Sequence, residues 1–138
     1  MPVATRLVID TNALVSRLLI PESTPGHAVR KAIDEGLVLI SEETIRELAD
    51  VLARPKFDRY VTVRERQEFI RLLGRVAELV PIVRPVKACR DPRDDKFLTL
   101  AVNGEAQLIV SGDGDLLDLN PFHGVNIMSP ATYLAAGC

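Results

Sequence analysis

Two short apolar runs, each leading to an aspartate, constrain the fold of this chain most strongly. The run 5–9 ends at Asp10, and the run 108–110 leads through Ser111 and Gly112 to Asp113. Both runs are rich in Val, Ile and Leu without polar alternation, which is typical of strands buried on both faces of a parallel sheet. Ligand sites in such sheets lie just beyond the carboxyl ends of the strands. We therefore expect Asp10 and Asp113 to meet at one edge of a parallel sheet.

Further strands and helices alternate along the chain. Apolar runs predict strands over 5–10, 37–40, 106–110 and 125–128. A weak strand over 82–86 is expected at a sheet edge because Pro85 interrupts it. Start and stop signals predict helices over 13–18, 27–35, 42–53, 63–79 and 91–103, with a last helix after Ser129. This order predicts an α/β sandwich around a mostly parallel central sheet.

Composition narrows the class of protein. The chain has 138 residues, of which 47% are hydrophobic and 26% charged, so we expect a single globular domain over 1–138. Two cysteines without metal-ligand spacing argue against a disulfide framework and favour the reducing cytoplasm. There is no apolar run of membrane-spanning length and no secretory pattern at the start. A net charge of −2 and a pI of about 5.7 exclude a strongly basic nucleic-acid binder.

Two more acids lie where predicted helices meet the packed core. Along the helix 42–53, Glu47 falls roughly 110° from the centre of the apolar stripe, at the border of the buried face. Glu42 is equally close on the opposite border, so the helical wheel leaves both glutamates open. Asp95 lies in the first turns of the helix 91–103 and directly precedes its apolar residues. We therefore expect Asp95 to lie close to packed structure as well.

Each acid also suits an ordinary structural role, such as a helix cap for Asp10, a helix N-terminus for Asp91 and Asp94, or a turn over 112–115. Their joint placement favours a site, because two like charges at about 4 Å repel by about 4 kcal/mol at an effective dielectric constant of about 20. Protons or cations must therefore accompany such a cluster, and carboxylate ligands suit Mg²⁺ or Mn²⁺. Metals held in this way activate water for phosphodiester cleavage.

Four segments around these acids resemble the motifs of the PIN-domain ribonuclease family. The segments are 7–12 (LVIDTN), 41–48 (SEETIREL), 94–101 (DDKFLTLA) and 108–117 (LIVSGDGDLL). Their order and spacing extend the resemblance across nearly the whole chain. It is closest to bacterial PIN proteins described as toxin components of toxin–antitoxin pairs, relatives of the VapC-type toxins.

The resemblance implies a three-layer α/β/α fold and Mg²⁺- or Mn²⁺-dependent cleavage of RNA. It also implies a homodimer and a small antitoxin partner. By position, the metal ligands would be Asp10, Glu47, Asp95 and Asp113, with Asp115 joining directly or through water. The resemblance further implies that Asn12 and Ser111 support the site and that Thr11 orients Asp10. Asp95 is chosen over the adjacent Asp94 because the apolar spacing after it fits the motif better.

Other chemistries lack their motifs in this sequence. We find no glycine-rich loop for dinucleotides or phosphates, no serine in a nucleophile elbow, and no histidine or cysteine pair at metal-ligand spacing. Two alternatives to the ribonuclease stay open at this point. A catalytically silent PIN-like module that binds RNA or protein would suit the acidic pI, and a metal-dependent phosphatase would use similar acids.

Overall fold

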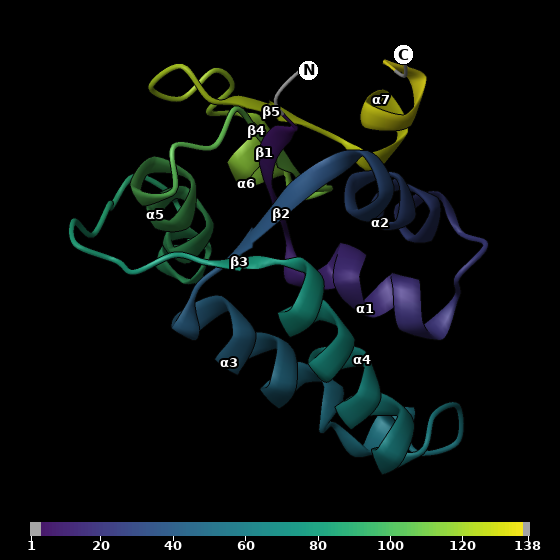
Figure 1. Ribbon diagram of the computed structural model, residues 1–138. Coiled ribbons are helices and arrows are strands. Elements are labelled where there is room, and N and C mark those ends of the chain that lie inside the picture. The colour runs from purple at the N-terminus through teal and green to yellow at the C-terminus, as the bar shows by residue number, and fades with distance from the viewer. Residues whose placement is uncertain (1–3, 137–138) are drawn as a thin grey trace.

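A five-stranded parallel sheet forms the centre of the computed structural model, which describes residues 4–136 (Figure 1). The strands are β1 (Thr5–Ile9), β2 (Gly36–Ile40), β3 (Glu78–Leu79), β4 (Leu108–Val110) and β5 (Asn126–Met128). Their order is β3-β2-β1-β4-β5, and each of these pairings is parallel. The first strand of the chain is therefore the middle strand of the sheet, with β4 beside it.

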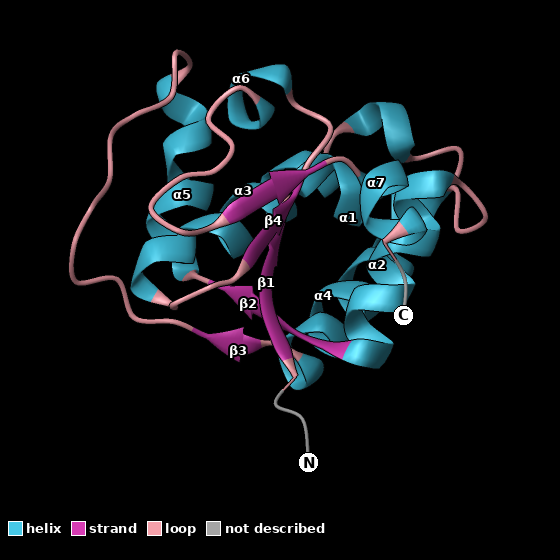
Figure 2. Cartoon of the chain, turned by 90° about the horizontal axis from the view of Figure 1, so that it is seen from above, coloured by secondary structure: helices cyan, strands magenta, loops and turns pink. Residues whose placement is uncertain are grey.

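Helices cover both faces of the sheet (Figure 2). They are α1 (Thr11–Leu19), α2 (Thr24–Glu35), α3 (Glu42–Leu52), α4 (Val63–Val76), α5 (Asp95–Asn103), α6 (Gly114–Leu117) and α7 (Pro130–Ala135), with 3₁₀ turns η1 (Pro55–Phe57) and η2 (Pro92–Asp94). One apolar cluster joins the sheet to α1, α2, α3, α4 and α7, and a second joins it to α5 and α6. The expected three-layer α/β/α sandwich is confirmed.

The central strand explains why its sequence lacks polar alternation. Successive side chains of a strand point to opposite faces of the sheet. Leu7 and Ile9 enter the first apolar cluster, whereas Val8 enters the second. All of these residues are at most 5% exposed. Both faces of β1 are thus buried over residues 7–9, and Asp10 follows directly at the carboxyl end of the strand.

The edge strand does not lie where the sequence predicted it. Helix α4 ends at Val76 instead of continuing to residue 79, and β3 follows at once, with Glu78 paired to Leu39 of β2. The predicted strand over 82–86 is irregular, and its backbone N–H groups at Val83 and Arg84 donate to the side chain of Asn103. Pro81 directly before this segment and Pro85 within it lack the N–H groups that a strand ladder needs, so a short strand before both prolines is favoured.

No helix within residues 4–136 is both long enough and apolar enough to cross a membrane.

Candidate functional site

An acid-lined pocket of about 320 Å³ lies at the carboxyl ends of β1 and β4. Its lining residues come from segments that are far apart in the sequence. They are Asp10, Thr11, Asn12, Glu47, Val51, Arg54, Asp91, Arg93, Asp94, Phe97, Asp113 and Leu116. Three of the four acids predicted as metal ligands, Asp10, Glu47 and Asp113, therefore line the pocket. The expected supporting residue Asn12 lines it as well.

Ser111 joins the two aspartates that end the strands. Because Ile9 pairs with Val110, the next residues of β1 and β4 leave the sheet side by side. The Ser111 hydroxyl donates to Asp10 Oδ2 at 2.6 Å and accepts from the Asp113 backbone N–H at 3.0 Å. The other oxygen of Asp10 accepts from the Ala13 N–H at 2.9 Å, so this side chain also caps α1. Asp10 is consequently held in one orientation beside Asp113.

Burial raises the pKa of the Asp10 carboxyl above its ordinary value, although the hydrogen bond from Ser111 acts in the opposite direction. The side chain is only 6% exposed. Desolvation disfavours the ionised form of a carboxyl group, and a neighbouring cation restores it. Asp10 is thus an acid whose charge would be stabilised by a positive ion in the pocket.

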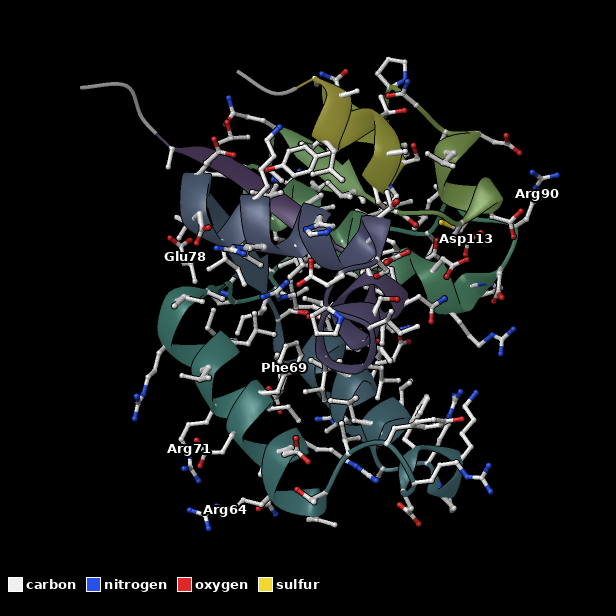
Figure 3. All side chains as sticks on the ribbon, turned by 90° about the vertical axis from the view of Figure 1, so that its right-hand side faces the viewer. Arg64, Phe69, Arg71, Glu78, Arg90 and Asp113 are labelled. Carbon is white, nitrogen blue, oxygen red and sulfur yellow. The ribbon has the colours of Figure 1, made fainter. Side chains whose placement is uncertain are left out.

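Asp94, Asp113 and Asp115 form the tightest group of acids among the described residues. Each offers one carboxylate oxygen, and these atoms lie within 4.8 Å of one another. Burial, followed by the neighbouring Asp113 carboxylate, raises the pKa of Asp94 to about 7. Asp115 also lies 3.2 Å from Arg90 Nε, and Figure 3 shows Arg90 beside Asp113 on this side of the molecule. Like charges are therefore crowded here, and Arg90 is paired with one of the three carboxylates.

Asp94, and not the predicted Asp95, faces this pocket. The Asp95 carboxylate points to another surface, where its Oδ1 accepts from the backbone N–H groups of Ala88 at 2.9 Å and Cys89 at 2.8 Å. Those hydrogen bonds lower the pKa of Asp95. Consecutive helical residues point about 100° apart, so only one of the two aspartates can turn inward. The apolar residues that follow fit both assignments, and the turn η2 sets the direction.

Glu47, and not Glu42, is the α3 glutamate that lines the pocket. Thr11 Oγ1 donates to Glu47 Oε1 at 2.5 Å, and Lys96 Nζ forms an ion pair with Glu47 Oε2. Glu42 is instead exposed and pairs with Arg46 at 3.2 Å. The expected role of Thr11 changes accordingly, because its hydroxyl group contacts Glu47 and not Asp10.

Sequence reasoning missed Asp94 and the arginines 54 and 93 in the pocket lining, and it missed Lys96, which pairs with the pocket acid Glu47. Arg93 pairs with Asp91 at 2.8 Å, while Arg54 is exposed at the rim. The doublet of aspartates at 94–95 was a usable signal for Asp94. Lys96 carried none, since a lysine at the start of a helix usually indicates a solvated surface.

The donors in this pocket fit a hard divalent cation. Carboxylate oxygens are the ligands that Mg²⁺ and Mn²⁺ prefer, and octahedral coordination leaves positions for water and substrate. Asp94, Asp113 and Asp115 are the residues closest together. Asp10 faces the same space from the end of β1, and Glu47 faces it from α3. The acids thus form a three-residue group with two further carboxylates around it.

Sequence comparisons with known proteins found a matching family model and a curated relative. A family model described as PIN domain matches residues 6–115. A curated protein of Methanocaldococcus jannaschii, "Uncharacterized protein MJ1680", is 30% identical over 118 residues, which cover 83% of this chain and 74% of that protein.

Three solved structures share the fold at low sequence identity. VapBC2 from Rickettsia felis, bound to a DNA fragment of its promoter, has a TM-score of 0.62 and 11% identity, covering 91% of this chain and 98% of its own. PAE2754 from Pyrobaculum aerophilum has a TM-score of 0.62 and 14% identity, covering 96% and 88%. VapC20 from Mycobacterium tuberculosis, a sarcin-ricin loop cleaving toxin, has a TM-score of 0.57 and 14% identity, covering 87% and 98%.

Proposed function

This chain belongs to the PIN-domain family, and from that premise we propose that it is an Mg²⁺- or Mn²⁺-dependent endoribonuclease. The observation that carries the proposal is the convergence of Asp10, Glu47, Asp94 and Asp113 in one pocket, with Asp115 grouped with Asp94 and Asp113. Carboxylates this close to one another repel unless protons or cations accompany them. No protein nucleophile is needed for hydrolysis at such a site.

We assign the metal to Asp10, Asp94 and Asp113, with Asp115 joining directly or through water. When bound, the ion would activate a water molecule and stabilise the charge that develops on the phosphate. The chain's own residues do the positioning. Ser111 holds Asp10 and the Asp113 backbone together, while Thr11 and Lys96 hold Glu47 on the opposite wall.

Arginines at the rim would contact the substrate backbone. Arg54 and Arg93 both line the pocket that holds the acids. Guanidinium groups bind phosphate oxygens in a fork geometry, and such contacts supply most of the sequence-independent affinity for nucleic acids. Arg54 and Arg93 thus offer two guanidinium groups to a nucleic-acid substrate, although Arg93 is paired with Asp91 and the whole chain has a net charge of −2.

RNA is the proposed substrate, and a small antitoxin is the proposed partner. VapC20 is a sarcin-ricin loop cleaving toxin, and VapBC2 was solved bound to a DNA fragment from its promoter. The antitoxin follows from the resemblance of the sequence motifs to the VapC-type toxins. The homodimer and the cytoplasmic location inferred from the sequence stay predictions. Size-exclusion chromatography with light scattering would test the dimer.

The direct test is cleavage of single-stranded and structured RNA with Mg²⁺ or Mn²⁺. We expect cleavage by the wild-type chain, loss of cleavage with a chelator, and loss of at least 10²-fold in Asp10→Asn and Asp113→Asn, since each removes a ligand of the ion. A small phosphomonoester assayed beside the RNA separates a nuclease from a phosphatase. Equal RNA cleavage by both variants and the wild type would reject the assigned site.

A second candidate function is a catalytically silent module that binds RNA or protein. The specific observation in its favour is that Lys96 is paired with Glu47 and Arg90 with Asp115. The charges of these two carboxylates are therefore balanced without a metal. Thermal unfolding with and without Mn²⁺ discriminates the two, because an ion that binds the folded state raises its stability. A melting temperature that does not respond to Mn²⁺ would favour the silent module.

A further inference from the structure

Lys96 is a nearly buried lysine that is paired with Glu47, one of the acids that line the pocket. Its side chain is 10% exposed, although lysine is almost never fully buried unless it is paired. We propose that the Lys96 ammonium group takes the place of a second metal ion, so that the pocket holds one dication and not two. The proposal rests on the metal-dependent function proposed above.

The ammonium group is held by contacts on several sides. Lys96 Nζ forms the ion pair with Glu47 Oε2 and donates to the backbone carbonyl of Arg93. It also lies 5.5 Å from the centre of the Phe97 ring, within the range of a cation–π contact. Phe97 is itself buried at 4% exposure. These contacts anchor a positive charge at one fixed place, as a bound ion would be anchored.

Glu47 has both of its oxygens occupied as a result. Oε1 accepts from the hydroxyl group of Thr11, which is 5% exposed, and Oε2 is paired with Lys96. Glu47 also does not belong to the group of Asp94, Asp113 and Asp115, whose carboxylate oxygens lie within 4.8 Å of one another. The acids therefore fall into two unlike sets, a glutamate paired with a lysine and a group of three aspartates of which Asp115 is paired with Arg90.

A lysine and a second dication would do different work on the Glu47 side. In two-metal sites the ions lie about 3.5–4 Å apart and stabilise both the attacking and the leaving oxygen. An ammonium group is a compact point charge that can hold a phosphate oxygen, but it cannot bind and acidify water as a metal does. Lys96 would thus balance the charge of Glu47 in place of a second ion, while the ion on the aspartates would activate the water.

Metal stoichiometry tests this proposal independently of catalysis. We expect the wild-type chain to bind one Mn²⁺ ion in a calorimetric titration and to give the electron paramagnetic resonance spectrum of isolated ions at saturation. Lys96→Met removes the charge and keeps much of the side-chain volume. It should bind two ions and show spin coupling between them, as expected for ions about 3.5–4 Å apart.

Three further variants make the result specific. Lys96→Arg keeps the positive charge and should bind one ion. Lys96→Met combined with Glu47→Gln should also bind one ion, because the second site would be built on the Glu47 carboxylate. Lys87→Met, which changes an exposed lysine on the loop before η2, should bind one ion like the wild type.

Two results would overturn the assignment of Lys96: two ions in the wild-type chain, or a single ion in a correctly folded Lys96→Met variant. Circular dichroism establishes folding, and Lys96→Gln replaces Lys96→Met if the latter is unfolded. The number of Mn²⁺ ions bound by the wild-type chain tests the proposal independently of the variants. Absence of Mn²⁺ binding in the wild-type chain would overturn both this proposal and the metal-dependent function, whereas RNA cleavage with the wrong ion count would overturn this proposal alone.

Discussion

Exchanging the adjacent aspartates 94 and 95 for asparagine, one at a time, should shift stability in opposite directions. The Asp94 oxygen lies within 4.8 Å of its counterparts on Asp113 and Asp115. At that separation two unit charges repel by about 3.5 kcal/mol at an effective dielectric constant of 20, and by about 1 kcal/mol in water. Asp94→Asn removes this repulsion, so the metal-free variant should be more stable than the wild type by about 1–3 kcal/mol.

Asp95→Asn should do the reverse. Its carboxylate accepts from two backbone N–H groups on the loop at 88–89, and hydrogen bonds to a charged acceptor contribute more than those to a neutral one. An asparagine oxygen can still accept, so we expect a loss of about 1 kcal/mol. For a chain of this length, 1 kcal/mol corresponds to a shift in melting temperature of roughly 3–5 °C.

Thermal unfolding at pH 8, with a chelator or with Mn²⁺, provides the assay, because Asp94, with a pKa of about 7, is ionised there. The wild type and Asp95→Asn should both melt higher with Mn²⁺, whereas Asp94→Asn should lose most of this rise. RNA cleavage should follow the same division. If Asp95→Asn loses the Mn²⁺ response and Asp94→Asn keeps it, the placement of these two side chains, and the reasoning from it, is refuted.

Three other predictions concern charge at and away from the pocket. Arg54→Ala should raise the KM for RNA and lower the salt dependence of RNA binding by about one phosphate contact, whereas Arg64→Ala on α4 should change neither. Fluorescence anisotropy at several salt concentrations measures the salt dependence of binding. In metal-free protein, the folded chain binds the Asp94 proton more tightly than the unfolded chain does. The contribution of Asp94 to the free energy of unfolding is therefore largest below its ordinary pKa of 3.8 and is lost as the pH rises towards about 7. Urea unfolding from pH 4 to pH 8 should show this pH-dependent component in the wild type and not in Asp94→Asn. Arg66→Ala should destabilise the chain by about 2–3 kcal/mol in urea unfolding, since the buried guanidinium donates to the carbonyls of Leu52 and Val61, and an unchanged midpoint would contradict this role.

Local patterns were sufficient for much of the architecture. The apolar runs ending at Asp10 and after Val110 placed β1 and β4 correctly, and the parallel pairing of these strands brings Asp10 beside Ser111. Ser41 was a recognisable N-cap, and its hydroxyl does accept from the Thr44 N–H. These features depend on a few consecutive residues, so propensity and periodicity already contain them.

The edge strand, by contrast, depended on competition between distant partners. The sequence suggested 82–86, but Glu78 pairs across the sheet with Arg6 at 2.6 Å, and β2 accepts the pairing from Glu78–Leu79. Residues 83 and 84 find their hydrogen bonds on Asn103 instead. Which segment forms a weak edge strand depends on the long-range pairing partners available to it. Those partners lie elsewhere in the chain, so the segment's own sequence does not predict the pairing.

The site shows the same limit at the level of single side chains. Strand ends and an acid-rich motif were enough to predict a carboxylate pocket, but the choice of Asp94 over Asp95, and the contact of Thr11 with Glu47, came from the packed chain. Neighbouring residues on a helix differ in direction by about 100°, and a rotation of that size about the helix axis exchanges which of them faces inward. Composition and spacing are unchanged by such a rotation, so the identity of the inward-facing acid is a property of how α5 and η2 pack against the sheet.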